Sequence, residues 1–159
     1  MLYVDSSALI KHYLQEAGTD ALNAKLTEVS TQRSRVFIST LGYAEILATF
    51  ARRLREKPSL KKETDRLKRE FEYDWTLNLN QVELDAGVLL QIPRLVTDHP
   101  LKAADAIHLA SALRLRDALK LGIHTGTASG PVEFAASDKQ LKTAATAEGF
   151  SVFDPESKP

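Results

Sequence analysis

The chain has 159 residues, of which 43% are hydrophobic and 26% are charged, and its formal net charge at neutral pH is zero. This composition is typical of one globular domain and excludes a disordered chain, and no apolar run approaches the ~20 residues that a membrane-spanning helix needs. The lack of cysteine excludes disulfides, thiol catalysis and thiolate metal sites. Because the sequence also starts without a secretory signal, we expect a cytoplasmic protein.

Short apolar runs alternate with helical patterns along the chain. Strands are expected at residues 2–5, 36–39, 75–79, 132–136 and 151–153. Helices are expected at residues 7–14 after a serine N-cap, 19–28 with Thr19 as the cap, 41–56, 60–74, 81–92, 102–121 and 139–148. This alternation predicts one α/β domain over residues 1–154, in which helices cover both faces of a mostly parallel five-stranded sheet, and a disordered tail over residues 155–159.

Proline and glycine residues divide these segments. Pro58 lacks an amide donor, so a break is expected between the helices at 41–56 and 60–74, and Pro93 is expected to end or kink the helix at 81–92. Residues 121–131 read LGIHTGTASGP and are expected to form a flexible loop. The loop has neither the lysine of a Walker A motif nor a GxGxxG pattern, which disfavours a nucleotide cofactor.

Charge is unevenly distributed along this neutral chain. Residues 52–69 contain nine basic and three acidic side chains, whereas residues 70–105 contain seven acidic side chains against Arg94 and Lys102. A basic arm beside an acidic centre would suit a protein that holds a phosphate backbone and concentrates metal ions at the point of cleavage. Two other interpretations of the arm stay open: docking of a protein partner, and a solvated helix face that binds nothing.

Four acidic residues follow the expected strands or lie just inside the next helix: Asp5, Glu45, Asp105 and Asp138. Active sites of parallel α/β sheets lie beyond the carboxyl ends of the strands, and Asp5 and Asp138 fall there. Carboxylates are costly beside apolar packing and repel one another, so bringing them together usually requires a cation. Hard divalent ions such as Mg²⁺ prefer oxygen ligands. The pattern therefore predicts a metal site made of acids, and phosphodiester cleavage is its natural chemistry.

Each acid also has a simpler structural explanation. Asp5 and Asp138 precede helices and would serve as N-caps, although the two serines after Asp5 could supply that cap. Glu45 lies in an early turn of its helix, where a negative charge interacts favourably with the helix dipole. Asp105 is harder to explain structurally, because it interrupts the apolar positions around Ile107. A charge beside core residues needs a partner, and a metal ion is one.

Four separated segments carry the pattern of a known family. They read YVDSSALIKHYLQE at 3–16, SxxxxAEI at 39–46, LKAADAIHLASAL at 101–113 and EFAASDKQLKTAATAEGFSVFDP at 133–155. In this order, and over almost the whole chain, they resemble the PIN-domain family, and most closely the VapC-type toxins of prokaryotic VapBC toxin–antitoxin modules. The departures are small. Ser6 stands where a threonine often follows the first aspartate, and Ala136-Ser137 where a threonine often precedes the fourth.

The resemblance implies a three-layer α/β/α PIN fold and an endoribonuclease that depends on one or two Mg²⁺ or Mn²⁺ ions. The catalytic, metal-binding acids of the family fall on Asp5, Glu45 and Asp105, and Asp138 falls on a fourth position that assists a second metal or the attacking water. The resemblance also implies an RNA substrate, a homodimer, and a cognate VapB-like antitoxin. In related toxins the early helices, here 7–28 and 41–74, form much of the groove that receives the antitoxin.

Several other residues are supporting candidates. Ser6 and Ser137 flank two of the acids, Lys11 lies beyond Asp5 on the same expected helix, and His108 follows Asp105 by three residues and shares its helix face. We expect His108 to pack near the site, where a substrate contact is open to it. Ser6 and Ser7 have no partner His–Asp arrangement in the sequence, which disfavours a serine hydrolase.

The remaining candidates have simpler explanations. The chain's histidines, His12, His99, His108 and His124, lack the spacing of a zinc site. Tyr3, Tyr43, Phe50 and Trp75 are expected to be core aromatics rather than stacking platforms for RNA bases.

Three rival functions stay open at this stage. The chain could be a PIN nuclease of RNA processing that is not a toxin, or a catalytically silent PIN module that binds RNA or protein. A phosphatase with Asp5 as nucleophile is disfavoured, because Ser7 stands where such enzymes need a second aspartate.

Overall fold

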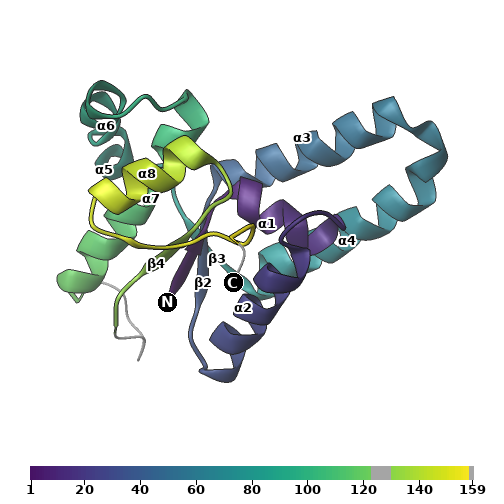
Figure 1. The fold of residues 1–159 in the computed structure, drawn as a ribbon, viewed down its shortest axis with the longest axis horizontal. Coiled ribbons are helices and arrows are strands. Elements are labelled where there is room, and N and C mark those ends of the chain that lie inside the picture. Colours follow the sequence, from purple (N-terminus) through teal and green to yellow (C-terminus); the bar gives the residue numbers. More distant parts are fainter. Residues whose placement is uncertain (123–129, 158–159) are drawn as a thin grey trace.

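The computed structural model describes residues 1–122 and 130–157, which form a five-stranded sheet in the order β3-β2-β1-β4-β5. Every neighbouring pair of strands is parallel. The strands are β1 (Leu2–Val4), β2 (Val36–Ser39), β3 (Leu79–Val82), β4 (Glu133–Ala135) and β5 (Ser151–Phe153). The α-helices are α1 (Ser6–Tyr13), α2 (Thr19–Thr31), α3 (Leu41–Glu56), α4 (Lys61–Leu77), α5 (Ala86–Leu89), α6 (Ile92–Asp98), α7 (Ala103–Lys120) and α8 (Lys139–Ala147). Figure 1 shows helices on both sides of the sheet, which confirms the expected α/β/α architecture.

Side chains alternate across β1, and this alternation separates two hydrophobic cores. Leu2 and Val4 pack on the side of α1, α2, α3 and α4, in a cluster that includes Phe71. Tyr3 points to the opposite side and stacks on Phe134, in the cluster covered by α5, α6, α7 and α8. All five side chains are buried. Since burying one large apolar side chain stabilises a fold by about 1.5–3 kcal/mol, β1 is anchored from both faces.

The parallel arrangement places the ends of the central strands next to one another. The Asp5 amide donates to the carbonyl of Ala135 at 3.0 Å, and the Thr40 amide donates to the carbonyl of Val82 at 3.0 Å. The chain then turns from β1 into α1, from β2 into α3 and from β4 toward α8. Residues that follow these strands, including Asp5 and Asp138, therefore lie at one end of the sheet, which we call its carboxyl end.

The third strand lies later in the chain than the sequence predicted. Residues 75–77, expected in a strand, form the last turn of α4, and β3 begins at Leu79. Trp75 lies one helical turn after Phe71 and contacts its ring and that of Tyr43. These helical contacts keep Trp75 in α4 instead of in a strand. The expected helix at 81–92 is also wrong. Asp85 caps the short α5 by accepting from the Val88 amide, and Pro93 lies in the first turn of α6 instead of ending a helix.

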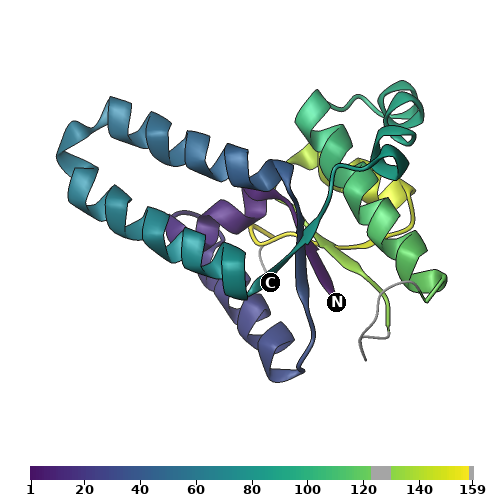
Figure 2. The same ribbon diagram turned by 180° about the vertical axis from the view of Figure 1, so that it is seen from behind.

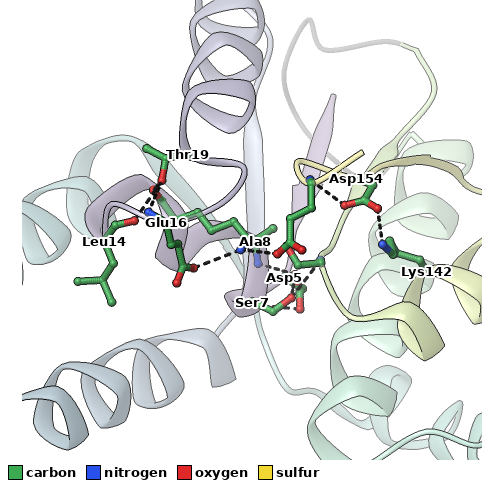
Figure 3. A network of polar contacts seen from close by, with 11 residues as sticks. Asp5, Ser7, Ala8, Leu14, Glu16, Thr19, Lys142 and Asp154 are labelled. Atoms are coloured by element: carbon green, nitrogen blue, oxygen red, sulfur yellow. Dashed lines mark hydrogen bonds and ion pairs between the residues drawn. The ribbon is translucent and has the colours of Figure 1, made fainter. Parts of the chain in front are cut away.

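Two helix starts also differ from the prediction. The N-cap of α1 is Asp5 itself, not a serine, and Ser6 is the first helical residue. The N-cap of α2 is Gly18, with a φ of +88°, not Thr19. A Cβ at position 18 would lie 2.9 Å from the Pro155 backbone, so both the left-handed conformation and the close approach favour glycine there. The Thr19 hydroxyl instead bonds the turn before the helix, accepting from the Glu16 amide and donating to the Leu14 carbonyl (Figure 3).

The α3–α4 hairpin extends away from the sheet to one side of the molecule (Figures 1 and 2). The expected break at Pro58 is confirmed, because Pro58–Leu60 forms a short 3₁₀ turn between the two helices. Near the sheet the hairpin is held by Phe50, Leu67 and Phe71, which are buried in the core beneath α1. Its outer half extends beyond that core.

The two segments expected to be flexible are described in part. In the loop at 121–131, residues 123–129 lie outside the described residues, as do residues 158 and 159 of the tail. The start of the tail makes contacts: Pro155 is buried, and Glu156 forms an ion pair with Lys11 at 2.6 Å. In the part of the chain that the structure describes, no helix has the length and apolar character needed to cross a membrane.

Candidate active site

Asp5 is buried at the carboxyl end of β1 and uses both carboxylate oxygens to cap α1. Its Oδ1 accepts from the Ser7 hydroxyl at 2.9 Å and from the Ala8 amide at 3.0 Å, and its Oδ2 accepts from the Ser7 amide at 3.2 Å (Figure 3). Burial raises the pKa of Asp5 above its ordinary value, although His108 and these hydrogen bonds oppose the rise. The capping role considered for Asp5 is therefore real, and the carboxylate lies at the site as well.

Glu45 projects from the second turn of α3 and is held by two residues of the site. Its Oε2 accepts from the Ser6 hydroxyl at 2.6 Å and contacts Nε2 of His108 at 2.7 Å. Partial burial raises the pKa of Glu45, but the hydrogen bonds from His108 and Ser6 outweigh it and lower the pKa below its ordinary value. Among the described residues nothing bonds Oε1, which leaves that oxygen available to a ligand.

His108 lies at the centre of the polar cluster and is only 1% exposed. Its Nδ1 lies 3.1 Å from the Tyr3 hydroxyl, and its Nε2 contacts Glu45. A carboxylate only accepts, so Nε2 carries the proton, and the Tyr3 hydroxyl then donates to Nδ1. Sequence analysis placed His108 near the site and missed Tyr3, whose partner is distant in the chain.

Asp105 and Asp138 approach the same region from α7 and α8. Burial and the neighbouring charge of Asp138 raise the pKa of Asp105 above its ordinary value. Asp138 is the N-cap of α8, and its Oδ1 accepts from the Leu141 amide at 2.9 Å. As with Asp5, the capping explanation holds for Asp138. The repulsion between the two carboxylates is what a shared cation would relieve.

The supporting candidates lie in different environments. The Ser7 hydroxyl accepts from the Ser137 amide at 3.2 Å, which joins the start of α1 to the loop before α8. The hydroxyl of Ser137 is buried without a hydrogen-bond partner among the described residues. Lys11 lines the same groove as Glu45, but its ammonium pairs with Glu16 at 3.2 Å and Glu156 at 2.6 Å. Lys11 is thus already occupied by two carboxylates.

The structure brings together a serine, a histidine and an acid that the sequence kept apart. Nε2 of His108 lies 3.1 Å from the Ser6 hydroxyl and 2.7 Å from Glu45. In a serine hydrolase the acid holds one ring nitrogen and the serine contacts the other. Here both lie on Nε2, Tyr3 occupies Nδ1, and the Ser6 hydroxyl donates to Glu45. This geometry does not activate Ser6 as a nucleophile.

Other histidines are engaged elsewhere. His12 contacts Asn23 at 2.6 Å and His99 contacts Glu148 at 2.9 Å, while His124 lies outside the described residues. As the side chains are arranged over residues 1–122 and 130–157, no three histidine, aspartate or glutamate side chains form a group close enough to hold a metal ion.

The donor set nevertheless fits a hard cation bound partly through water. Glu45 Oε1 and the buried Ser137 hydroxyl have no protein partner among the described residues, and both are oxygen donors. Burial raises the pKa of Asp5 and of Asp105, and neither carboxylate forms an ion pair with a lysine or an arginine among the described residues. Mg²⁺ keeps several waters and bridges one or two protein carboxylates to substrate phosphates, so a loosely arranged set of acids suits it.

Comparison with known proteins identifies the family of this chain. The model of the PIN domain matches residues 2–120, which include Asp5, Glu45 and Asp105. The chain belongs to the PIN-domain family. Two curated relatives are Ribonuclease VapC45 and Ribonuclease VapC49, from two strains of Mycobacterium tuberculosis. Each is 32% identical over 117 residues, which cover 74% of this chain and 78% of the relative, so the chain is one of the VapC-type PIN proteins.

Solved structures share the fold at low sequence identity. VapBC2 from Rickettsia felis, bound to a DNA fragment from its promoter, matches with a TM-score of 0.62 and 10% identity over 97% of this chain and 98% of that one. FitAB bound to IR36 DNA matches with a TM-score of 0.64 and 16% identity over 100% and 98% of the two chains. VapBC-1 from nontypeable Haemophilus influenzae matches with a TM-score of 0.58 and 13% identity over 99% and 100%. These matches confirm the PIN-like sheet and its flanking helices.

Proposed function

We propose that this PIN-domain protein is a metal-dependent endoribonuclease and the toxin of a type II toxin–antitoxin module. The observation that carries the proposal is a group of acids without lysine or arginine partners. Among the described residues, none of Asp5, Glu45, Asp105 and Asp138 forms an ion pair with a lysine or an arginine, and two have raised pKa values. Acids in this state at the carboxyl end of a PIN sheet are suited to bind a divalent cation. The ribonuclease names of the two curated relatives agree with this chemistry.

The four carboxylates would divide the work. Asp5, Glu45 and Asp105 would hold Mg²⁺ or Mn²⁺, and Asp138 would orient the attacking water or complete a second, weaker ion site. The bound ion would supply an activated water and neutralise charge on the scissile phosphate. His108, fixed by Tyr3, would keep Glu45 turned so that Oε1 faces the ligand. In-line attack by water would leave a 5′-phosphate and a 3′-hydroxyl.

The biological setting follows from the relatives rather than from the site. Of the three solved structures compared above, two are VapBC assemblies and two are bound to DNA. We infer a cognate VapB-like antitoxin, a homodimeric toxin and a cytoplasmic location for this chain. An acidic site is well suited to inhibition by a basic antitoxin side chain, because opposite charges complement each other across an interface.

The test is cleavage of total cellular RNA by purified protein freed of any bound partner, with Mg²⁺, Mn²⁺ or EDTA. We expect discrete products that require metal, and mapping their ends would identify the target RNA. The inactive control is Asp5→Asn, since asparagine caps helices about as well as aspartate but carries no charge. Folded protein that cleaves no RNA with either metal would overturn the proposal and favour a silent binding module. Equal cleavage by Asp5→Asn would overturn the metal assignment.

A further inference from the structure

The outer end of the α3–α4 hairpin carries a concentrated positive charge. Residues 52–62 contain six basic side chains and one acidic side chain, Glu56. Figures 1 and 2 show this part of the hairpin extending beyond the helices that cover the sheet. The charge is therefore presented to solvent or to a partner, at a distance from the fold's own core.

Some basic residues of the hairpin form ion pairs and others do not, and Arg69 on α4, away from the tip, is among those without an ion-pair partner in the described residues. Along α4, Lys61 pairs with Asp65 at 2.6 Å, Arg66 with Glu70, and Lys68 with Glu72 at 3.7 Å, each one helical turn apart. By contrast, four exposed residues near the tip have no ion-pair partner among the described residues. We call them the unpaired cluster: Arg52, Arg55, Lys57 and Lys62.

A groove connects Arg52, one member of the unpaired cluster, with Glu45 of the candidate active site. One face of α3 lines it at helical spacing, through Glu45, Thr49, Arg52, Arg53 and Glu56. Ser6 and Ser7 line its other wall at the site end, and its volume is 540 Å³. Arg52 stands two turns beyond Glu45 on the same helix, about 10 Å away along the axis. A strand whose phosphate lies at the acids would pass Arg52 as it leaves the site.

We propose that the unpaired cluster binds the phosphate backbone of the RNA strand whose scissile bond lies at the four acids. The inference rests on the proposed function and extends it to a second part of the substrate. The physical need is plain, because four carboxylates repel a polyanion and nearby unpaired cations offset that repulsion. Contacts to phosphates position a strand without reading its bases. The cluster therefore raises the affinity for RNA and orients the strand, and it does not select the bases.

An RNA backbone fits these observations better than an acidic protein segment. Arg52 lines the same groove as Glu45, and the rest of the unpaired cluster lies further along the hairpin, so one bound strand would contact both the acids and the tip. Carboxylates already line this groove at Glu16, Glu45 and Glu56. A negatively charged protein segment would be attracted by the basic tip but repelled by the carboxylates along the groove. A nucleic acid would be attracted by the same tip, and divalent cations would bring its phosphates to the acids of the site.

The experiment compares two triple variants with the same composition. Arg52→Gln, Lys57→Gln and Lys62→Gln together remove one arginine and two lysines from the unpaired cluster. Arg66→Gln, Lys61→Gln and Lys68→Gln remove the same residue types from the ion-paired set on α4. Each triple is placed on Asp5→Asn, so that RNA is bound but not cut. Binding of a mixed-sequence single-stranded RNA is measured by fluorescence anisotropy over a range of salt concentrations.

We expect the first triple to reduce the slope of log affinity against log salt by about 2, because each phosphate of a single strand that the protein neutralises adds ~0.7 to that slope. The second triple is expected to change the slope by less than half as much, because its charges are already neutralised by acids. Equal effects of the two triples, or an unchanged slope in the first, would overturn the proposal and assign the tip to an acidic protein partner or to solvent.

Failure of this inference is separable from failure of the proposed function. Cleavage by protein with an intact Asp5 is measured alongside, with and without the first triple. Metal-dependent cleavage together with an unchanged salt slope overturns the role of the unpaired cluster alone. Absence of RNA binding and of cleavage overturns both.

Discussion

The two ends of α8 place partly buried acids in different electrostatic environments. At its start, Asp138 caps the helix, burial and the charge of Asp138 raise the pKa of the neighbouring Asp105, and neither acid has a basic ion-pair partner among the described residues. At its end, Glu148 accepts two hydrogen bonds from Arg94, at 2.7 and 2.8 Å, and contacts His99 at 2.9 Å. Hydrogen bonds from Arg94 lower the pKa of Glu148 to about 2 against the effect of burial, and His99 assists.

This difference separates acids that hold the fold together from acids kept available for a ligand. Arg94 and His99 join α6 to the end of α8, so Glu148 stabilises contacts across 54 residues of sequence. Asp5 and Asp138 cap helices, but neither they nor Asp105 gains an ion pair with a basic residue among the described residues, and burial of a carboxylate without a positive partner costs free energy. Carboxylates whose pKa burial raises, and that a fold retains at such a cost, are candidates for function. Changing one acid in each group should therefore have opposite consequences.

The largest expected effect is on cleavage by Asp105→Asn. The change removes a candidate metal ligand, and losing about 4 kcal/mol of transition-state stabilisation would slow cleavage by about 10³-fold. Thermal stability should be unchanged or higher, because a carboxyl whose pKa burial raises is replaced by a neutral amide. The measurements are initial cleavage rates and a thermal melt in EDTA.

Asp85→Asn is the matched control for this variant. Asp85 also lies at a helix start, where it accepts from the Val88 amide, but it pairs with Arg114 away from the site. We expect near-normal cleavage and a small loss of stability. Comparable cleavage rates in the Asp85 and Asp105 variants would remove the functional distinction between the two kinds of acid.

A second prediction concerns how Glu45 is held, because it is the site acid that His108 contacts. Tyr3→Phe deletes the hydroxyl that donates to Nδ1 of His108 and thereby loosens the contact between Nε2 and Glu45. Mutating a residue that hydrogen-bonds to a metal ligand typically lowers metal affinity or activity by about 10–100-fold. We therefore expect kcat to fall about tenfold with little change in KM for RNA. Affinity for Mn²⁺, measured by electron paramagnetic resonance without substrate, should fall as well.

Tyr13→Phe provides the control for this effect. Tyr13 is also buried, and its hydroxyl donates to Asp74 at 2.9 Å on the other side of the sheet. Losing either hydrogen bond should cost about 1 kcal/mol of stability, so the two variants should melt alike. If both variants cleave equally, Tyr3 is structural only.

The third prediction concerns the acid that stabilises the fold. The pKa of Glu148 in the folded protein lies below its ordinary value of 4.5, so its contribution is fully present above that pH and is lost as the pH falls toward about 2. Glu148→Gln should cost about 1–2 kcal/mol at neutral pH, a figure reduced because Arg94 is half exposed. Denaturant unfolding should show this difference shrink between pH 4.5 and 2. Cleavage at 25 °C should be retained, and its loss would place Glu148 in the site.

The sequence predicted the parts of this molecule that depend on local pattern. Alternating strands and helices indicated the α/β/α fold, and the site acids were found because they follow strands or begin helices. β3 was misplaced because it is an edge strand whose Asn80 and Gln81 lack the β-branched pattern of a buried strand, while Trp75 resembles one. The start of α1 was misplaced because three consecutive residues, Asp5 to Ser7, could each cap a helix.

Contacts between distant segments were beyond the sequence. No local pattern pairs Tyr3 with His108, or Arg94 with Glu148, since each pair forms only when the two elements pack. Equally, the number of basic residues in the hairpin did not reveal that Lys61, Arg66 and Lys68 are paired with acids and that several at the tip are not. The metal-ligand roles of the four acids stay a prediction, and stabilisation of the protein by Mg²⁺ tests that prediction without RNA.

The smallest expected effect is stabilisation by the ion itself. If the acids lack a positive partner, Mg²⁺ at ten times its dissociation constant should add ~1.4 kcal/mol to the free energy of unfolding, which raises the Tm by a few degrees. Asp105→Asn should lose most of this shift, whereas Glu148→Gln should keep it, because Glu148 already has Arg94. NaCl at matched ionic strength controls for screening. An equal Mg²⁺ shift in Asp105→Asn would mean that the ion binds elsewhere, and the contrast between the two ends of α8 would then be one of stability alone.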